Sequence, residues 1–164
     1  SMMDKEELTL TLAPMDIEAC LQEAVNHFKL SAEQRQGWID ISCEVGDYEM
    51  EGDLIQFKSA LTNLIDNAIK YSLDAPQVSV KLAQSVDEFR IMVKDRGIGM
   101  DEDTKRQVFD RFYRATKGNI HDVKGHGLGL SFVKEIIEKH GGSIQVDSAP
   151  NAGTTFTVVL PKTA

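Results

Sequence analysis

Two short runs of alternating apolar and polar residues, 77–84 and 88–94, stand close together near the middle of the chain. In the second run Phe89, Ile91 and Val93 fall on one face, as they do in a strand with one buried side. Because only a few residues separate the two runs, they predict an antiparallel hairpin. The sheet of this protein is therefore not expected to be purely parallel.

Segments with the apolar period of helices surround this hairpin. Three of them are long, at 16–36, 53–72 and 128–140. A short helix is expected at 101–108, and further strands are expected at 8–12 (ended by Pro14), 38–45, 48–51, 143–148 and 154–160. This order predicts an α+β fold, a two-layer α/β sandwich whose mixed, mostly antiparallel sheet is covered on one face by three helices. A doubly wound parallel fold is disfavoured, because its glycine fingerprint should follow the first strand and the glycine loops here come late.

Composition excludes several classes of protein. The formal net charge of −8 argues against non-specific binding of nucleic acid, which needs a basic face. No apolar run approaches the roughly 18 residues of a membrane span. Cys20 and Cys43 lack the spacing of a zinc or redox motif, so we expect two free thiols.

The second long helix carries a polar stripe made of Asn63, Asn67 and Lys70, opposite its apolar stripe. Such a stripe is often only a solvated face. However, asparagine is a mediocre helix former, and here it occurs twice, one turn apart. A carboxamide oxygen suits Mg²⁺, and lysine suits phosphate. Both interpretations stay open from these residues alone.

Three further motifs are weak when taken singly. In DRGIGM, Asp95 ends a strand and is followed by Gly97 and Gly99, where the backbone can bend sharply and a flat ligand can approach; an ordinary tight turn is the alternative. In FDRFYRA, aromatic residues such as Phe109 can anchor the segment to the hydrophobic core. Arg111 and Arg114 could then reach phosphates. GHGLG opens onto a helix, whose N-terminus attracts phosphate; its glycines are Gly125, Gly127 and Gly129.

Together with GTTFTVVLP at 153–161, these motifs resemble, in order and spacing, the N, G1, F, G2 and G3 boxes of the ATP-binding catalytic domain of sensor histidine kinases. That superfamily also holds DNA gyrase, HSP90 and MutL. The resemblance covers 63–160 and implies the Bergerat-type ATP-binding fold. It further implies one domain over 8–164, with 1–7 a cloning remnant and a linker from an upstream helical region, and with a mobile ATP lid at about 113–126.

The resemblance also implies roles for particular residues. Asn67 would coordinate Mg²⁺ bound to ATP, Asn63 would assist it, and Lys70 would lie near the phosphates. Asp95 would read the adenine amine in a pocket shaped by Gly97 and Gly99. The remaining nucleotide-binding positions would be Tyr71 beside the nucleotide, Arg111 or Arg114 at phosphate, the loop residues Gly125, Gly127, Leu128 and Gly129 around the triphosphate, and Thr155 supporting adenine through water.

The same resemblance makes an expectation about chemistry. The gyrase, HSP90 and MutL relatives carry a water-activating glutamate where Asn63 stands, and asparagine cannot act as a general base. We therefore expect a domain that holds ATP and donates its γ-phosphoryl group to a histidine on a separate dimerisation domain, with a response regulator as an indirect partner. No nucleic acid or membrane contact is expected of this chain. It would be a cytoplasmic part of a membrane-anchored sensor kinase.

The histidines of the chain are not expected to accept the phosphoryl group. His121 precedes an acid, as an acceptor histidine does, but the match ends at Gly125 and no amphipathic helix surrounds it. A metal site from His121 and His126 is disfavoured. His140 stands at a helix C-terminus, where an imidazolium would suit the helix dipole. Two other functions remain open. One is an anti-sigma-factor serine kinase, which phosphorylates a protein serine without a histidine intermediate, and the other is a non-catalytic nucleotide-sensing or interaction module.

Overall fold

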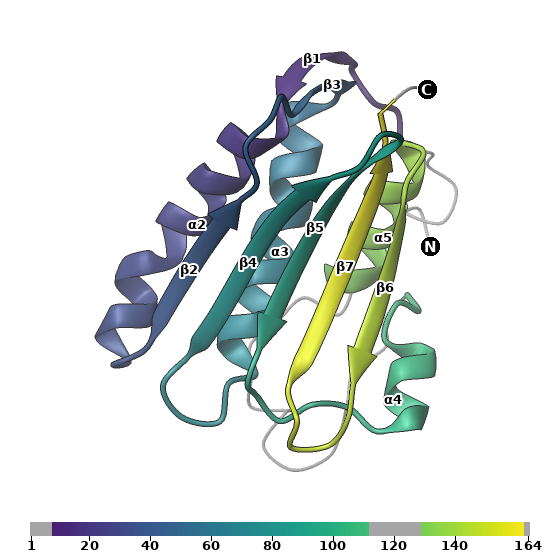
Figure 1. The fold of residues 1–164 in the computed structure, drawn as a ribbon. Helices are drawn as coiled ribbons and strands as arrows, with labels where there is room; N and C mark the ends of the chain where they lie inside the picture. Colours follow the sequence, from purple (N-terminus) through teal and green to yellow (C-terminus); the bar gives the residue numbers. More distant parts are fainter. Residues whose placement is uncertain (1–7, 112–128, 163–164) are drawn as a thin grey trace.

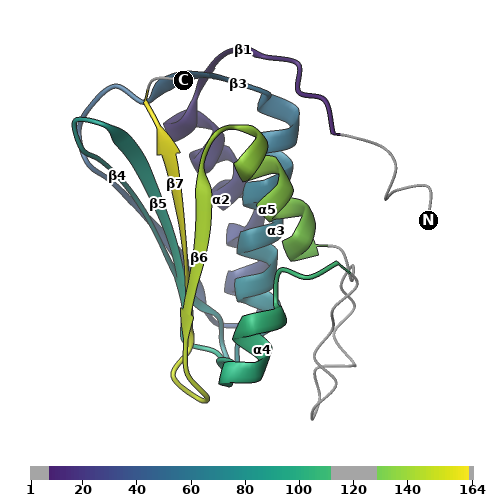
Figure 2. The same cartoon turned by 90° about the vertical axis from the view of Figure 1, so that its right-hand side faces the viewer.

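The computed structural model describes residues 8–111 and 129–162. Its main sheet has five strands in the order β2 (Trp38–Cys43), β4 (Gln77–Gln84), β5 (Glu88–Asp95), β7 (Thr154–Pro161) and β6 (Ser143–Ser148) (Figure 1). β2 runs parallel to β4, and the other neighbours are antiparallel. The helices α2 (Ile17–Gln34), α3 (Leu54–Lys70) and α5 (Gly129–Lys139) lie on one face of this sheet, as the side view in Figure 2 shows. The predicted two-layer sandwich and mixed sheet are confirmed.

The core lies between the sheet and the helices because each element buries one face. On β5 the alternation places Phe89, Ile91 and Val93 inward, whereas Arg90 and Lys94 remain exposed. On α3 the predicted apolar face is buried from Phe57 onward and is extended by Ile69, whereas Leu54, which was also predicted to belong to it, is exposed. Removal of this apolar surface from water is the main source of stability for such a fold.

A separate two-stranded ribbon corrects the prediction for the beginning of the chain. β1 (Ala13–Asp16) pairs with β3 (Glu49–Gly52), so the strand lies after 8–12 and includes Pro14. Proline lacks an N–H but is tolerated in a strand with a free edge, as β1 is in this ribbon. The alternating leucines at 8–12 resemble a strand, yet Leu12 is largely exposed.

The start of α3 is joined to the end of α5 by buried polar contacts. Asp53 caps α3 by accepting a hydrogen bond from the Gln56 backbone, and it also accepts one from the Thr11 backbone. The hydrogen bonds from Thr11 and Gln56 hold the pKa of Asp53 below its usual range. The Asp53 N–H donates to Nε2 of His140 at 3.0 Å, and Nδ1 of His140 lies 2.8 Å from the Ile136 carbonyl.

This arrangement corrects the expectation for His140. Because a backbone N–H can only donate, Nε2 must be the unprotonated nitrogen, and Nδ1–H donates to the carbonyl. His140 is therefore a neutral, buried acceptor that joins two elements, and it is not an imidazolium that neutralises a helix end.

Replacing His140 by alanine is expected to lower the free energy of unfolding by about 1–3 kcal/mol, because a buried N–H loses its acceptor and a cavity forms. Urea denaturation of the two proteins measures this loss. His27→Ala, at an exposed position on α2, is the control and should change stability by less than about 0.5 kcal/mol. Equal effects of the two substitutions would contradict the role given to His140.

Candidate nucleotide-binding site

The segments that carry the predicted and described site residues meet at one end of the sandwich. This end is formed by the last turn of α3, the end of β5, the start of β7 and the short helix α4 (Glu102–Gln107), which all lie at the bottom of Figure 1. The start of α5 faces the same end in Figure 2. Segments that are far apart in sequence are thus brought together, as the spacing of the motifs requires.

Asp95 is the last residue of β5 and is buried at this end of the sandwich. Its side chain is only 5% exposed, and its Oδ1 accepts hydrogen bonds from the backbone N–H groups of Gly97 at 2.8 Å and Thr154 at 3.2 Å. Burial raises the pKa of Asp95 to about 6, and the two hydrogen bonds oppose part of that rise. Within the described residues no hydrogen bond reaches the other oxygen, Oδ2. The carboxylate is thus held rigidly by one oxygen, while the second is left as an acceptor.

The two glycines of the DRGIGM motif allow backbone segments to pack closely. A Cβ on Gly97 would lie 2.1 Å from the Tyr71 carbonyl oxygen, which accepts a hydrogen bond from the Ile98 N–H. Gly99 has a φ of +69°, and a Cβ there would lie 1.9 Å from the Ala149 carbonyl oxygen. Both glycines therefore fix the loop after Asp95 against α3 and against the β6–β7 turn, in addition to any role beside a ligand.

The polar stripe of α3 lies where the sequence predicts it. Asn63, Asn67 and Lys70 are half-buried, whereas the stripe that contains Leu64 and Ala68 is buried in the core. The ammonium of Lys70 lies 2.9 Å from the Asp66 carboxylate, one turn earlier on the helix. The geometry thus presents two carboxamides and a lysine on one face of α3, close to the end of the sandwich that holds Asp95.

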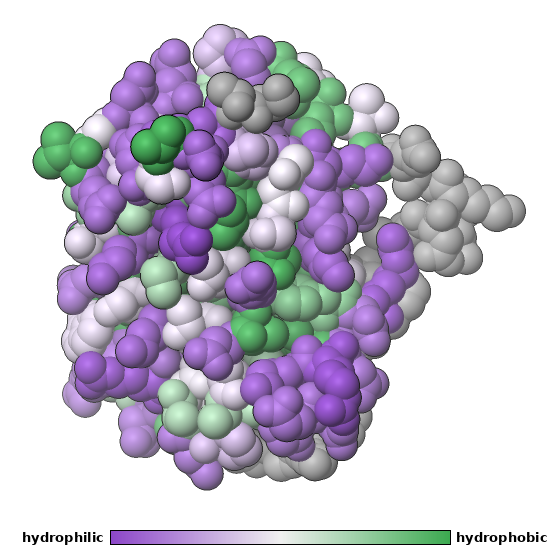
Figure 3. Space-filling view, turned by 45° about the vertical axis from the view of Figure 1, so that its right-hand side comes forward, coloured by the Kyte–Doolittle hydropathy of each residue, from purple (hydrophilic) through white to green (hydrophobic). Residues whose placement is uncertain are grey.

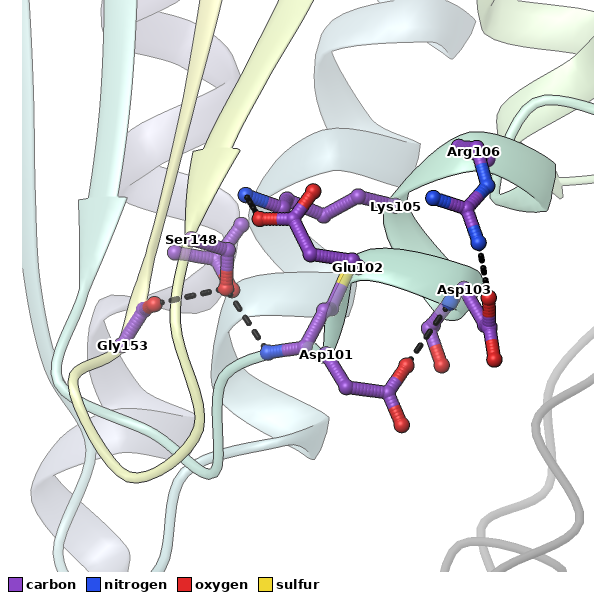
Figure 4. A network of polar contacts seen from close by, with 10 residues as sticks. Asp101, Glu102, Asp103, Lys105, Arg106, Ser148 and Gly153 are labelled. Carbon is purple, nitrogen blue, oxygen red and sulfur yellow. Dashed lines mark hydrogen bonds and ion pairs between the residues drawn. The ribbon is translucent and has the colours of Figure 1, made fainter.

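The F-box segment is anchored by its first aromatic residue, as its composition predicts. The rings of Phe109 and Phe156 meet edge to face with centroids 6.0 Å apart, and the Lys134 ammonium lies 5.8 Å from the Phe109 ring centroid. Figure 3 shows one face of the molecule, with hydrophobic side chains gathered in its middle and hydrophilic surface around them. Part of that hydrophilic surface is α4, which carries ion pairs such as Glu102–Lys105 (Figure 4).

Several predicted site residues lie outside the described part of the chain. They are Arg114, Gly125, Gly127 and Leu128, together with His121, His126 and the segment 113–126. Arg111 is the last described residue before this segment and is exposed. Gly129 begins α5, and a Cβ there would meet nothing within 4 Å. Their roles remain predictions from the resemblance.

The structure separates Thr155 from the site and brings Thr154 into it. The side chains of β7 alternate, so Thr154 shares the buried face of Phe156 and Val158, while Thr155 points to the open face of the sheet. Thr154 is the cross-strand partner of Asp95. The alternation of 156, 158 and 160 is the signal that places Thr154, and not Thr155, on the buried face beside Asp95; the role given to Thr155 stays a prediction from the resemblance.

The described residues also bear on the cysteines, whereas His121 and His126 lie outside the described part of the chain. Within 8–111 and 129–162 no cluster of His, Cys, Asp and Glu suits a metal ion, and no helix is long and apolar enough to cross a membrane. Cys20 and Cys43 are both free thiols. Burial raises the pKa of Cys20 to about 11, which makes it an unreactive core residue.

Comparison with known proteins agrees with the geometry of the site. Residues 52–164 match the family model described as histidine kinase-, DNA gyrase B- and HSP90-like ATPases. The chain is 36% identical to the sensor protein RprX of Bacteroides fragilis over 98% of its length, which is 31% of that protein. It is 36% identical to the sensor-like histidine kinase SenX3 of Mycolicibacterium smegmatis over 92% of its length, which is 39% of that protein. The chain thus spans about a third of the length of these relatives.

Solved structures agree as well. The mycobacterial sensor histidine kinase MprB is 28% identical, with a TM-score of 0.75, and the match covers 92% of this chain and 97% of that one. The catalytic domain of the histidine kinase ThkA has the same fold, with a TM-score of 0.81 at 24% identity; the match covers 93% of this chain and 99% of that one. The chain therefore belongs to the histidine kinase-, DNA gyrase B- and HSP90-like ATPases, as the catalytic domain of a sensor histidine kinase.

Proposed function

We propose that this domain binds Mg-ATP at the end of the sandwich described above and transfers the γ-phosphoryl group to a histidine on a separate phosphoacceptor domain. In this step the bond between the γ-phosphorus and the oxygen that leads to ADP breaks, and a bond from phosphorus to an imidazole nitrogen forms. A response regulator would then receive the group. The domain would work on the cytoplasmic side of a membrane-anchored sensor kinase.

The observation that carries this proposal is the environment of Asp95. A carboxylate with one oxygen tied to the backbone and the other left as an acceptor suits a ligand that presents a donor, such as the exocyclic amine of adenine. An ionised form is needed for the strongest bond, and a pKa of about 6 keeps Asp95 mostly ionised at neutral pH.

The residues of α3 suit the other end of the nucleotide. Asn67 offers a carboxamide oxygen to Mg²⁺, with Asn63 one turn earlier, and Lys70 offers a charge to the phosphates. Arg111, Arg114 and the glycine loop at 125–129 would complete the phosphate contacts. Because Asn63 cannot activate water, hydrolysis should be slow, and the rate of transfer would depend on positioning and charge stabilisation.

Transfer between two purified domains tests this function. With radiolabelled ATP and Mg²⁺, the chain alone should gain no phosphohistidine, whereas an added phosphoacceptor domain from the same full-length protein should become labelled. Asn67→Ala should reduce the rate of labelling at least about tenfold, because a Mg²⁺ ligand is lost. Asn26→Ala, at an exposed helical position on α2, is the matched control.

Two outcomes would contradict the proposal. Label on His121 of the isolated chain would show that the acceptor lies inside this domain. Equal rates for Asn67→Ala and Asn26→Ala would show that the polar stripe of α3 is only a solvated face. SenX3, one of the matched relatives, is named a sensor-like histidine kinase, which favours histidine rather than serine as the acceptor.

A further inference from the structure

A buried serine lies beside the residues that hold Asp95. Ser148 ends β6, and its cross-strand partner on β7 is Thr154, whose partner on β5 is Asp95. The three side chains thus form a row across neighbouring strands, and they are 8%, 6% and 5% exposed respectively. Ser148 lies in none of the motifs that the sequence analysis singled out.

Three polar atoms contact the Ser148 hydroxyl, each at 2.8 Å. The Met100 N–H donates to it, the Gly153 carbonyl oxygen lies beside it, and its third neighbour is the Thr154 hydroxyl. Figure 4 shows Ser148 between Gly153 and the backbone that leads into α4. These contacts connect the β6–β7 turn to the loop that follows Asp95.

The chemistry of these neighbours fixes the direction of every hydrogen bond. A serine hydroxyl has one proton, and a carbonyl oxygen can only accept, so the Ser148 proton goes to Gly153. The Met100 N–H can only donate, which uses one lone pair of Ser148. The bond between the two hydroxyls must therefore run from Thr154 to Ser148. The proton of Thr154 is committed to Ser148, and its hydroxyl can offer only lone pairs to any other group.

We propose that Ser148 is a positioning residue that fixes the Thr154 hydroxyl as a hydrogen-bond acceptor toward the nucleotide base. This inference rests on the proposed binding of ATP at the same site. Thr154 and the free oxygen of Asp95 then present two acceptors and no donor. Adenine offers an amine at the position where guanine and hypoxanthine carry an oxygen, so two acceptors facing that position favour adenine.

Binding of ADP and inosine diphosphate by isothermal titration tests the inference. The two ligands share sugar and phosphates and differ at the base, where an oxygen replaces the amine and the neighbouring ring nitrogen gains a proton. Wild-type protein should bind ADP more tightly. In Ser148→Ala the Thr154 proton is released and can be donated to that oxygen. The dissociation constant of inosine diphosphate divided by that of ADP should therefore fall about three- to tenfold. This is the size expected when one hydrogen bond is gained or lost.

Two further variants separate this role from a merely structural one. In a Thr154→Val background, Ser148→Ala should leave the ratio unchanged, since Ser148 acts only through the Thr154 hydroxyl. Ile144→Val, a core change on the same strand, should lower stability without moving the ratio. If Ser148→Ala does not fold, Ser148→Cys keeps the side-chain size with a poorer acceptor and should shift the ratio in the same direction.

The outcomes distinguish this inference from the proposed function. If the wild-type protein binds neither nucleotide, the proposed function itself is contradicted. A wild-type protein that prefers ADP, together with a Ser148→Ala ratio equal to that of wild type, would overturn the role of Ser148 and leave the function intact. A fall in the ratio that persists in the Thr154→Val background would also overturn it.

Discussion

Asp95→Asn is expected to raise the free energy of unfolding at pH 7.5 by about 1–3 kcal/mol and to weaken ADP binding about 100-fold. The gain in stability arises because the folded protein keeps a carboxylate whose pKa is about 6 instead of 3.8, a difference that corresponds to about 3 kcal/mol. The amide still accepts the hydrogen bonds from Gly97 and Thr154. Its NH₂ group, however, would face the adenine amine as a second donor, so ADP binding is weakened.

The pH dependence of this gain is fixed by the direction of the shift. An acid whose pKa is raised by folding costs stability wherever it is ionised in the unfolded state. The cost is absent below about pH 4, grows as the pH rises and is complete above about pH 6. The advantage of Asp95→Asn should therefore shrink as the pH falls from 7.5 to 5. Urea denaturation at both pH values, with exposed Asp40→Asn as control, measures it. A gain that is the same at both pH values would contradict burial as its cause.

Gly99→Ala is expected to lower the free energy of unfolding by about 3 kcal/mol or more. Gly99 has a φ of +69°, which side chains disfavour, and the new Cβ would lie 1.9 Å from the Ala149 carbonyl oxygen. The loop would have to move away from the β6–β7 turn and break the hydrogen bond from the Asn151 N–H to the Ile98 carbonyl, at 2.7 Å. Both stability and ADP binding should fall.

Gly129→Ala is the matched control for this prediction, because a Cβ at Gly129 would meet no atom within 4 Å. Alanine also favours a helix, so this variant should be as stable as wild type or slightly more so. Thermal unfolding of both variants makes the comparison. A Gly99→Ala protein as stable as Gly129→Ala would show that the close contact at Gly99 relaxes without cost.

Local patterns in the sequence were sufficient to predict much of this fold. Asp16 and Asp53 accept hydrogen bonds from the first turns of α2 and α3, as expected of helix caps, and the hairpin of β4 and β5 forms where apolar and polar residues alternate. The parallel pairing of β2 with β4 was not predicted, since no local pattern states which strand lies beside which. The alternation at 8–12 also misled: Leu8 packs against the core, but Leu12 is largely exposed and the segment forms no strand.

The site could be predicted only in part for a similar reason. Asp95 and the α3 stripe were found because their residue types are unusual for their positions. Ser148 was missed because an isolated serine carries no signal, and its role depends on Met100 and Gly153 arriving from other segments. His140 looked like a helix-end cation until the N–H of Asp53, 87 residues away, determined which ring nitrogen holds the proton.

The parallel strand β2 has a consequence for how the chain folds during synthesis. β2 lies at 38–43, before the span that matches the family model, yet it covers one edge of β4. α2 and β2 leave the ribosome before the other strands of the main sheet and have no sheet to join until β4 emerges, more than thirty residues later. A protein fragment that began at residue 52 would leave one edge of β4 unpaired. Such an exposed strand edge is prone to aggregate by pairing with other chains. We therefore expect a unit that folds alone to include residues before the span that matches the family model.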